Sequence, residues 1–152
     1  MKILILSDNH GNFEIIKKVL NIEKNVDIYL HLGDYELPEY LLNNFLLVKG
    51  NCDYLSNEPI SRTIEINNFK IYLEHGINFT KTLYKENYIK NTNADIFLFG
   101  HTHTRLASKL DNIYIFNPGS ISKPRDNSKR TYLILYLNKN KELKYEFKEI
   151  EL

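Results

Sequence analysis

The feature that most constrains the fold is a set of short, uninterrupted apolar runs that each end at a polar side chain. Residues 2–6, KILIL, form a run of strand length just before Asp8, which is typical of a strand buried on both faces in a parallel sheet. Residues 12–24 place apolar side chains at helical spacing, and Asn12 is available as the N-cap. The segment 27–34, DIYLHLGD, supplies a second strand. These elements predict a βαβ unit and an α/β fold.

The rest of the chain predicts further strands and few helices. We expect a short helix near 37–43 and a third strand within 43–53. The later elements are expected to be two strands around an Asn-Asn turn in 62–76, a helix at about 80–92, a buried strand in 94–103, and two hairpins in 105–120 and 129–152. Together they predict a mixed α/β sandwich.

Length and composition exclude several classes of protein. At 152 residues the chain can bury a sizeable core, and we expect residues 1–152 to form a single domain. Lys and Arg number 20 against 19 Asp and Glu, so neither a general nucleic-acid-binding surface nor a membrane-binding surface is expected. Cys52 is the one cysteine, which rules out an internal disulfide and, without a signal-peptide pattern, indicates a cytoplasmic location. No apolar run approaches transmembrane length.

Side chains that can bind metals follow the ends of five predicted strands. They are Asp8, His10, Asp34, Asn51, His75, His101 and His103. Because ligands bind beyond the carboxyl ends of parallel strands, we expect these seven side chains to converge on one site. Carboxylate, imidazole and amide donors without thiolates suit Mn²⁺, Fe²⁺, Zn²⁺ or Ni²⁺. The set is large enough for two ions if Asp34 bridges them, and two such ions can stabilise both oxygens of a displacement at phosphorus.

The same residues form five short motifs in a fixed order. The motifs are Asp8-x-His10, Gly33-Asp34, Gly50-Asn51-Cys52-Asp53, His75-Gly76 and Gly100-His101-x-His103. Their order and spacing resemble those of the calcineurin-like metallophosphoesterases. The stretches DNHGN, GNCD and NPGSISKPR, with the short length, are similar to the small YfcE-type phosphodiesterase subfamily. The resemblance spans residues 3 to about 136.

This resemblance implies a four-layer αββα sandwich of two mixed β-sheets flanked by helices, with a dimetal centre at the strand ends. It implies that Asp8, His10, Asp34 and His103 bind the first ion, and that Asp34, Asn51, His75 and His101 bind the second. Mn²⁺ is the expected metal, with Ni²⁺, Fe²⁺, Zn²⁺ and Mg²⁺ as alternatives. The implied activity is hydrolysis of a small phosphodiester by in-line attack of a metal-bridging hydroxide, with Asp34, Asn51 and His101 as catalytic residues.

Four residues are candidates for contact with the substrate: Asn12, Cys52, Arg105 and Arg125. Asn12 either contacts a phosphate oxygen or only caps the first helix, and a guanidinium suits phosphate. Many superfamily members have a histidine where this chain has Cys52, and that histidine is thought to contact the phosphoryl oxygen or to protonate the leaving group. A thiol is a poor substitute, so we expect a preference for esters with stabilised leaving groups. The alternative is that Cys52 only fills a small apolar space.

Other residues are expected to support the site. His31 has no counterpart among the ligands of the family and is expected to pack or to orient a ligand. Asn117, Gly119 and Ser120 are expected to form a loop near the metals, mainly through backbone contacts. Gly100 is expected to let the loop before His101 turn without a side chain in the way. The alternating pattern of residues 139–152 predicts a solvated strand face, or an edge used to form a homo-oligomer.

Two other functions remain open. The retromer subunit Vps29 resembles this fold and works mainly as a protein-interaction scaffold, with an altered metal site. A scaffold has no reason to keep all seven donors, and this chain keeps them. The other alternative is a phosphomonoesterase or protein phosphatase, which Cys52 and the small size disfavour.

Overall fold

Two five-stranded sheets pack face to face in the computed structural model, which describes residues 1–152. One sheet has the order β10-β9-β1-β2-β3 and the other β4-β5-β6-β8-β7. The strands of the first sheet are β1 (Lys2–Leu6), β2 (Ile28–His31), β3 (Phe45–Leu47), β9 (Arg130–Leu137) and β10 (Leu143–Ile150). The strands of the second are β4 (Ser61–Ile66), β5 (Phe69–Glu74), β6 (Ile96–Leu98), β7 (Arg105–Leu110) and β8 (Ile113–Pro118).

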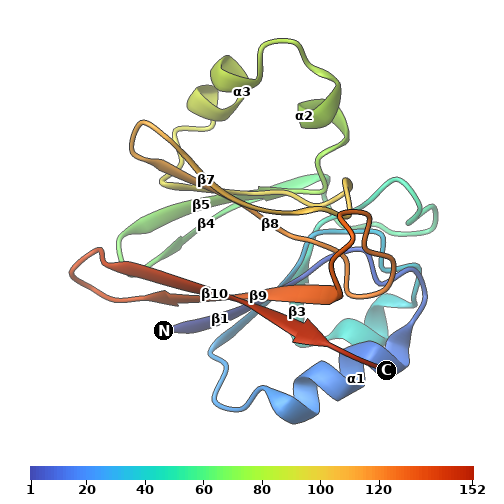
Figure 1. The fold of residues 1–152 in the computed structure, drawn as a ribbon. Coiled ribbons are helices and arrows are strands. Elements are labelled where there is room, and N and C mark those ends of the chain that lie inside the picture. The colour runs from blue at the N-terminus through green and yellow to red at the C-terminus, as the bar shows by residue number, and fades with distance from the viewer.

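Helices cover the outer face of each sheet, which gives four layers (Figure 1). Helix α1 (Phe13–Ile22) and the 3₁₀ turn η1 (Glu39–Leu42) lie against the first sheet, while α2 (Ile77–Lys81) and α3 (Lys85–Asn91) lie against the second. Both sheets are mixed: β1, β2 and β3 are parallel, as are β5, β6 and β8, and antiparallel strands complete each sheet. The predicted αββα sandwich is confirmed.

The side chains of β1 explain why the first sheet is covered on both faces. Its side chains alternate between two cores: Ile3 and Ile5 lie in the core between the sheets, and Leu4 and Leu6 lie in the core under α1. All four are fully buried, and burial of each such side chain contributes about 2 kcal/mol. A strand that is apolar at every position therefore fits only a sheet that is covered on both faces.

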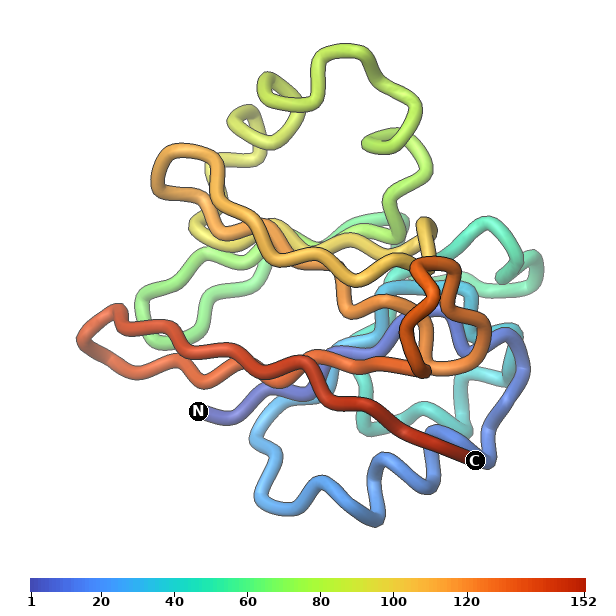
Figure 2. The backbone as a smooth tube through the Cα atoms, in the orientation of Figure 1, coloured from blue at the N-terminus to red at the C-terminus, as the bar shows by residue number.

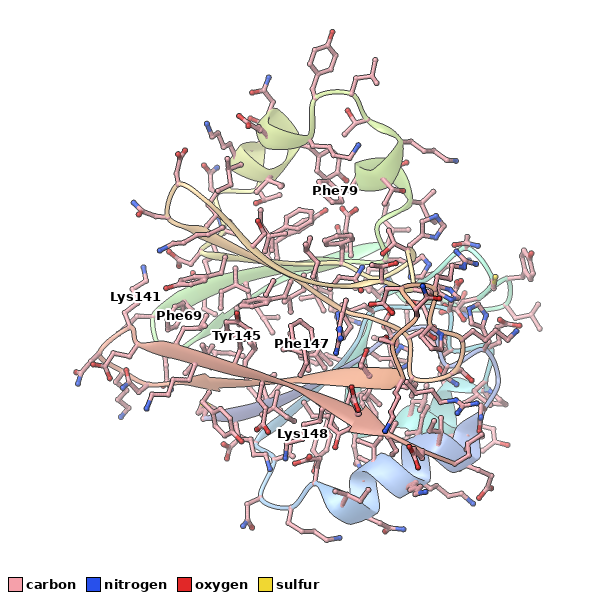
Figure 3. The ribbon with its side chains drawn as sticks, in the orientation of Figure 1. Phe69, Phe79, Lys141, Tyr145, Phe147 and Lys148 are labelled. Atoms are coloured by element: carbon pink, nitrogen blue, oxygen red, sulfur yellow. The ribbon has the colours of Figure 1, made fainter.

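The second outer layer differs from its prediction. A single helix was expected at about 80–92, but the chain forms α2 and α3 with a break at Thr82, whose backbone is extended. The break lets two side chains from different helices reach one aromatic core. Phe79 packs on Phe97 and Phe99 at centroid distances of 4.9 and 4.8 Å, and Ile89 joins the same cluster. Figure 3 shows Phe79 pointing from α2 towards the sheet.

Two other predicted elements are shorter in the structure than expected. The short helix near 37–43 is a single 3₁₀ turn that follows Pro38. The strand expected within 43–53 is only Phe45–Leu47, because the residues after it bend towards the ends of the neighbouring strands. No helix of the chain has the length and apolar character needed to span a bilayer. The expected cytoplasmic location stays a prediction.

A buried carboxylate joins α1 to three strands of the first sheet. Glu23, at the end of α1, is 3% exposed. It accepts hydrogen bonds from Lys2 Nζ at 2.8 Å and Tyr132 Oη at 2.8 Å, and Lys148 Nζ lies 3.0 Å away. Lys148 is on the α1 side of β10, opposite Phe147 (Figure 3). Burial alone would raise the pKa of Glu23, but these partners outweigh it and hold the pKa below its ordinary value.

We expect Glu23→Gln to lower the free energy of unfolding by about 2 kcal/mol near neutral pH, because an amide cannot neutralise two ammonium groups. The folded-state pKa of Glu23 is depressed, so its contribution is complete above the ordinary pKa and is lost as the pH falls through the folded value. Urea unfolding near pH 7 and near pH 3 should show a smaller difference between the two proteins at the lower pH. Glu65→Gln, at an exposed position of β4, is the control. An equal difference at both pH values would contradict this assignment.

Candidate metal centre

The loops after β1, β2, β3, β5 and β6 meet at one end of the two sheets, as the tube in Figure 2 shows. Three of the predicted ligands form the first part of a cluster there. His103 Nε2 lies 3.2 Å from Asp8 Oδ1 and 3.1 Å from His10 Nε2. Ligand atoms of all three residues lie within 4.8 Å of one another, which is close enough to share one cation.

The other four predicted ligands adjoin this group. His75 Nε2 lies 3.0 Å from Asn51 Oδ1, 3.4 Å from Asp34 Oδ2 and 3.3 Å from His101 Nδ1. The same nitrogen lies 3.9 Å from Asp8 Oδ1, so His75 joins the two groups. The structure therefore brings all seven predicted ligands into one connected cluster.

Asp8 is the most deeply placed member of this cluster. It is fully buried, and its Oδ1 has no hydrogen-bond partner. The other oxygen, Oδ2, accepts hydrogen bonds from Ser7 Oγ at 2.5 Å and from the His101 amide at 3.1 Å. A buried carboxylate oxygen without a donor is costly unless a cation compensates it. The orphaned oxygen therefore fits a metal ligand.

The histidines are oriented as metal ligands usually are. His75 Nδ1 donates to the Leu32 carbonyl and His103 Nδ1 to the Lys123 carbonyl, both at 2.7 Å. These bonds place the proton on Nδ1 and leave the lone pair of each Nε2 facing the cluster. His10 is held from its other side, where Nδ1 lies 2.5 Å from Glu36 Oε1. The donor set thus fits divalent transition metals.

Five of the seven predicted ligands have a left-handed backbone, which non-glycine residues seldom adopt. They are Asp8, His10, Asp34, His101 and His103, with φ values of 58°, 44°, 53°, 66° and 57°. Each such residue costs on the order of 1 kcal/mol and persists only where its surroundings hold it. The strand ends therefore turn sharply towards the cluster at a cost that other contacts must offset.

The Asp53 carboxylate holds the two loops on the β2–β3 side. It accepts backbone hydrogen bonds from Asp34 and Gly50, at 2.7 and 2.8 Å, and from Glu36, at 2.8 Å. Asp53 and Glu36 were assigned no role from the sequence. The position of Asp53 in the motif Gly50-Asn51-Cys52-Asp53 could have indicated a role at the site. No sequence motif contains Glu36, and its role follows only from its contact with His10 in the fold.

A side chain near the end of β8 and one in the loop after it hold the other two strand ends. Ser120 Oγ donates to the Asp8 carbonyl at 2.7 Å. Asn117 Nδ2 donates to the Gly100 carbonyl at 2.8 Å. We expected mainly backbone contacts from this loop, but its side chains make the supporting hydrogen bonds.

Gly100 serves close packing and not a left-handed turn. Its φ lies outside the left-handed region, and a Cβ at this position would lie 2.1 Å from Ser7 Oγ and 2.9 Å from Asp8 Oδ2. No side chain larger than hydrogen fits unless Ser7 and Asp8 move. The absent side chain thus lets the β6 loop approach the end of β1.

His31 is the one histidine outside the cluster. It is fully buried and packs edge-on against Tyr35 and Phe45, while its Nδ1 accepts a hydrogen bond from the Gly33 amide at 3.2 Å. Burial lowers its pKa to about 3, so the ring is neutral. These contacts favour the packing role and place His31 beside the loop that carries Asp34.

Asn12 and Cys52 occupy different surroundings. Asn12 Oδ1 accepts from the Ile15 amide at 3.2 Å, so it has one of its two expected roles, the cap of α1. Its contact with a phosphate oxygen stays a prediction. Cys52 lies beside the cluster: its amide donates to Asp34 Oδ1 at 2.8 Å, and its Sγ lies 3.3 Å from Asn51 Nδ2. Burial and the nearby Asp34 carboxylate raise the pKa of the thiol to about 11, which keeps it neutral at pH 7.

The two arginines lie at the edge of the site. Arg105 Nε lies 3.8 Å from Asp126 Oδ2, and its Nη1 lies 3.8 Å from Glu149 Oε1, so its charge is already shared by two carboxylates. Arg125 has an exposed side chain, and its amide donates to the His103 carbonyl at 3.0 Å. The structure shows no contact of either guanidinium with the cluster, and their roles in substrate binding stay predictions.

The fold and the site define an αββα protein with a carboxylate, amide and imidazole cluster at the strand ends. Residues 1–140 match the model of the calcineurin-like phosphoesterase superfamily domain. The chain is 34% identical over 143 residues to the probable metallophosphoesterase YsnB of Bacillus subtilis, covering 90% of this chain and 85% of that protein. It is 27% identical over 164 residues to phosphodiesterase YfcE of Escherichia coli K12, covering 89% and 87%. The chain belongs to the calcineurin-like phosphoesterase superfamily.

Solved structures show the same architecture. A predicted phosphoesterase from Streptococcus pneumoniae TIGR4 superposes with a TM-score of 0.80 at 29% identity, covering 97% of both chains. Vps29 from Entamoeba histolytica, described as complexed with Zn²⁺, superposes with a TM-score of 0.77 at 24% identity, covering 97% of this chain and 98% of that one. At that identity the second likeness concerns the fold alone.

We expect Mn²⁺ to stabilise this chain and His103→Gln to weaken that stabilisation. The reason is that His103 Nε2 lies 3.2 Å from Asp8 Oδ1, which has no hydrogen-bond partner. A metal at about 100 times its Kd adds about 2.7 kcal/mol to the free energy of unfolding. The measurement is the thermal midpoint with and without Mn²⁺. His31→Gln is the matched control: it loses stability but keeps the full response to Mn²⁺. An unchanged response in His103→Gln would remove this residue from the ligand set.

Proposed function

We propose that residues 1–152 act as one metallophosphoesterase domain that hydrolyses small phosphodiesters with two divalent ions. One observation carries the proposal: the buried, partnerless Oδ1 of Asp8 is surrounded by imidazole nitrogens whose lone pairs face it. A site built only for stability would not leave a buried carboxylate oxygen without a donor.

The two parts of the cluster suggest how the ligands divide between the ions. Asp8, His10, Asp34 and His103 would hold one ion, and Asp34, Asn51, His75 and His101 the other. We propose Mn²⁺ as the metal, with Ni²⁺, Fe²⁺, Zn²⁺ and Mg²⁺ as alternatives that the same donors accept. Two bound ions supply the Lewis acidity that activates the attacking water for in-line displacement and neutralises the phosphoryl oxygens.

The less buried ligands are the ones that can also meet the substrate. Asn51 is exposed, and while its Oδ1 faces His75, its Nδ2 lies on the Cys52 side and can donate to a phosphoryl oxygen. His101 is half-buried, and its Nε2 has no partner in the protein. Asp34 is buried and would act through its charge: the Cys52 amide holds its carboxylate, and Asp53 holds its own amide. These three residues are therefore the proposed catalytic ligands.

The expected preference for esters with stabilised leaving groups rests on Cys52. A neutral thiol beside the cluster cannot protonate an alkoxide as an imidazole can. Substrates whose leaving group needs no proton, such as aryl esters, are thus favoured over alkyl monoesters.

We expect the metal-stripped chain to regain hydrolysis of bis(4-nitrophenyl) phosphate when Mn²⁺ or another of the divalent ions is added. Asp34→Asn should lower kcat by about 100-fold or more, because the variant would remove the negative charge that Asp34 would supply to the two ions. Asp111→Asn, in the turn between β7 and β8, is the matched control and should keep full activity.

Turnover also separates the enzyme from a scaffold. A Vps29 is described as complexed with Zn²⁺, so metal binding alone does not distinguish the two functions. A chain that binds every ion but hydrolyses neither diester nor monoester would support the scaffold. Faster hydrolysis of 4-nitrophenyl phosphate than of its diester would support the phosphomonoesterase.

We expect Cys52→His to raise the rate on an alkyl leaving group relative to an aryl leaving group by about 100-fold, since the imidazole can act as a general acid. Cys52→Ala should leave that ratio unchanged. The measurement is kcat/KM for methyl 4-nitrophenyl phosphate and for a dialkyl phosphate of a fluorogenic alcohol. The same ratio in all three proteins would show that position 52 does not control the leaving group.

A further inference from the structure

A pocket of about 510 Å³ opens beside the metal cluster, between the loops that follow β2 and β3. Ten residues line it, half of them hydrophobic, and all fall within 35–39 and 52–56. This volume suits a small organic ligand. The seven metal ligands do not line it, so the pocket is separate from the cluster itself.

Glu36 and Cys52 form the wall that the pocket shares with the cluster. Glu36 Oε1 lies 2.5 Å from His10 Nδ1, and the Cys52 amide donates to Asp34 Oδ1 at 2.8 Å. Ligand atoms of His10, Glu36 and Cys52 all lie within 4.8 Å of one another. The pocket therefore adjoins the cluster across these two residues, close to where a phosphoester would bind.

The inner wall of the pocket is held in place by hydrogen bonds. Tyr35 is 1% exposed, and its hydroxyl lies 2.5 Å from Ser56 Oγ. Ser56 Oγ also donates to Glu39 Oε1 at 2.6 Å, and the Asn57 amide donates to the same oxygen at 3.1 Å. The rim of the pocket, by contrast, carries two solvent-exposed side chains: Tyr54 is 82% exposed and Leu55 is 97% exposed. A flat apolar ligand would cover this rim.

The charge of the pocket restricts what can enter it. Glu36, Glu39 and Asp53 line it, and no Lys, Arg or His does. A second phosphate or a carboxylate on the ligand would meet these carboxylates without a cation to offset the repulsion. The pocket therefore suits an uncharged group and disfavours an anionic one.

We propose that this pocket binds the leaving group of the diester and selects an uncharged aromatic one, such as an aryl alcohol or a nucleoside without further phosphates. The role as leaving-group site rests on the proposed phosphodiesterase activity. The geometry of the pocket and its lack of cations carry the selectivity.

The kinetic test compares two diesters, methyl 4-nitrophenyl phosphate and methyl 3-carboxy-4-nitrophenyl phosphate, whose leaving groups differ in one charge. We expect kcat/KM to be at least about 10-fold higher for the uncharged leaving group. Glu39→Gln should narrow this ratio several-fold, whereas Glu86→Gln, exposed on α3, should not. Tyr54→Ala should raise KM for the uncharged ester several-fold, and Tyr84→Ala, also exposed, should leave it unchanged. Equal kcat/KM for both esters would overturn the selectivity.

A binding measurement tests the pocket without turnover. Adenosine added to the metal-free protein should shift the ¹H–¹⁵N signals of residues 54–56, and Tyr54→Ala should abolish the shifts. If diesters are hydrolysed but adenosine leaves these signals unmoved, the pocket proposal fails and the phosphodiesterase stands. If adenosine shifts them but no ion restores hydrolysis, the phosphodiesterase fails, and with it the role of the pocket as leaving-group site.

Discussion

The buried carboxylate of Asp8 is the constraint on which the rest of the site depends. It lies at the end of a strand that is apolar on both faces, with one oxygen already hydrogen-bonded and the other bare. A negative charge in such a place requires positive charge nearby. His75 and His103 use Nδ1 to hydrogen-bond backbone carbonyls and turn Nε2 towards this oxygen, so a cation held between them would compensate the carboxylate. The architecture thus creates the demand for metal before any substrate is considered.

The backbone strain that this arrangement requires lies in the loops that follow the strands. Five of the predicted ligands have left-handed backbones, and polar side chains that hydrogen-bond directly to the loop backbones offset this strain. Asp53 does so for two loops and Ser120 for the end of β1. Proteins commonly place strain at functional sites and stabilise it from outside. These supporting residues are therefore as much a part of the site as the ligands.

Local patterns predict a mixed α/β sandwich and the cluster at the strand ends, whereas the four-layer order was implied by the resemblance to the calcineurin-like phosphoesterases. Apolar runs of strand length and the Asp and His residues after them fix where the strands end. The break between α2 and α3 was not predicted, since it depends on Phe79 and Ile89 sharing an aromatic core contributed by β6 and its loop. Glu36 was missed for a similar reason: its contact with His10 joins loops of different strands. The ion pairs of Arg105 likewise arise from residues far along the chain.

The strand order of the first sheet has a consequence for how the protein is made. β1 lies between β2 and β9, so it pairs on one side with the next strand along the chain and on the other with a strand that is synthesised much later. Ser120, which holds the Asp8 carbonyl, also comes late in the chain. During translation β1 and its carboxylate must wait, with one edge unpaired, until residues 130–137 have emerged. Non-local pairing of this kind is also slow, so the growing chain carries an open edge and an unfinished site until β9 has paired with β1.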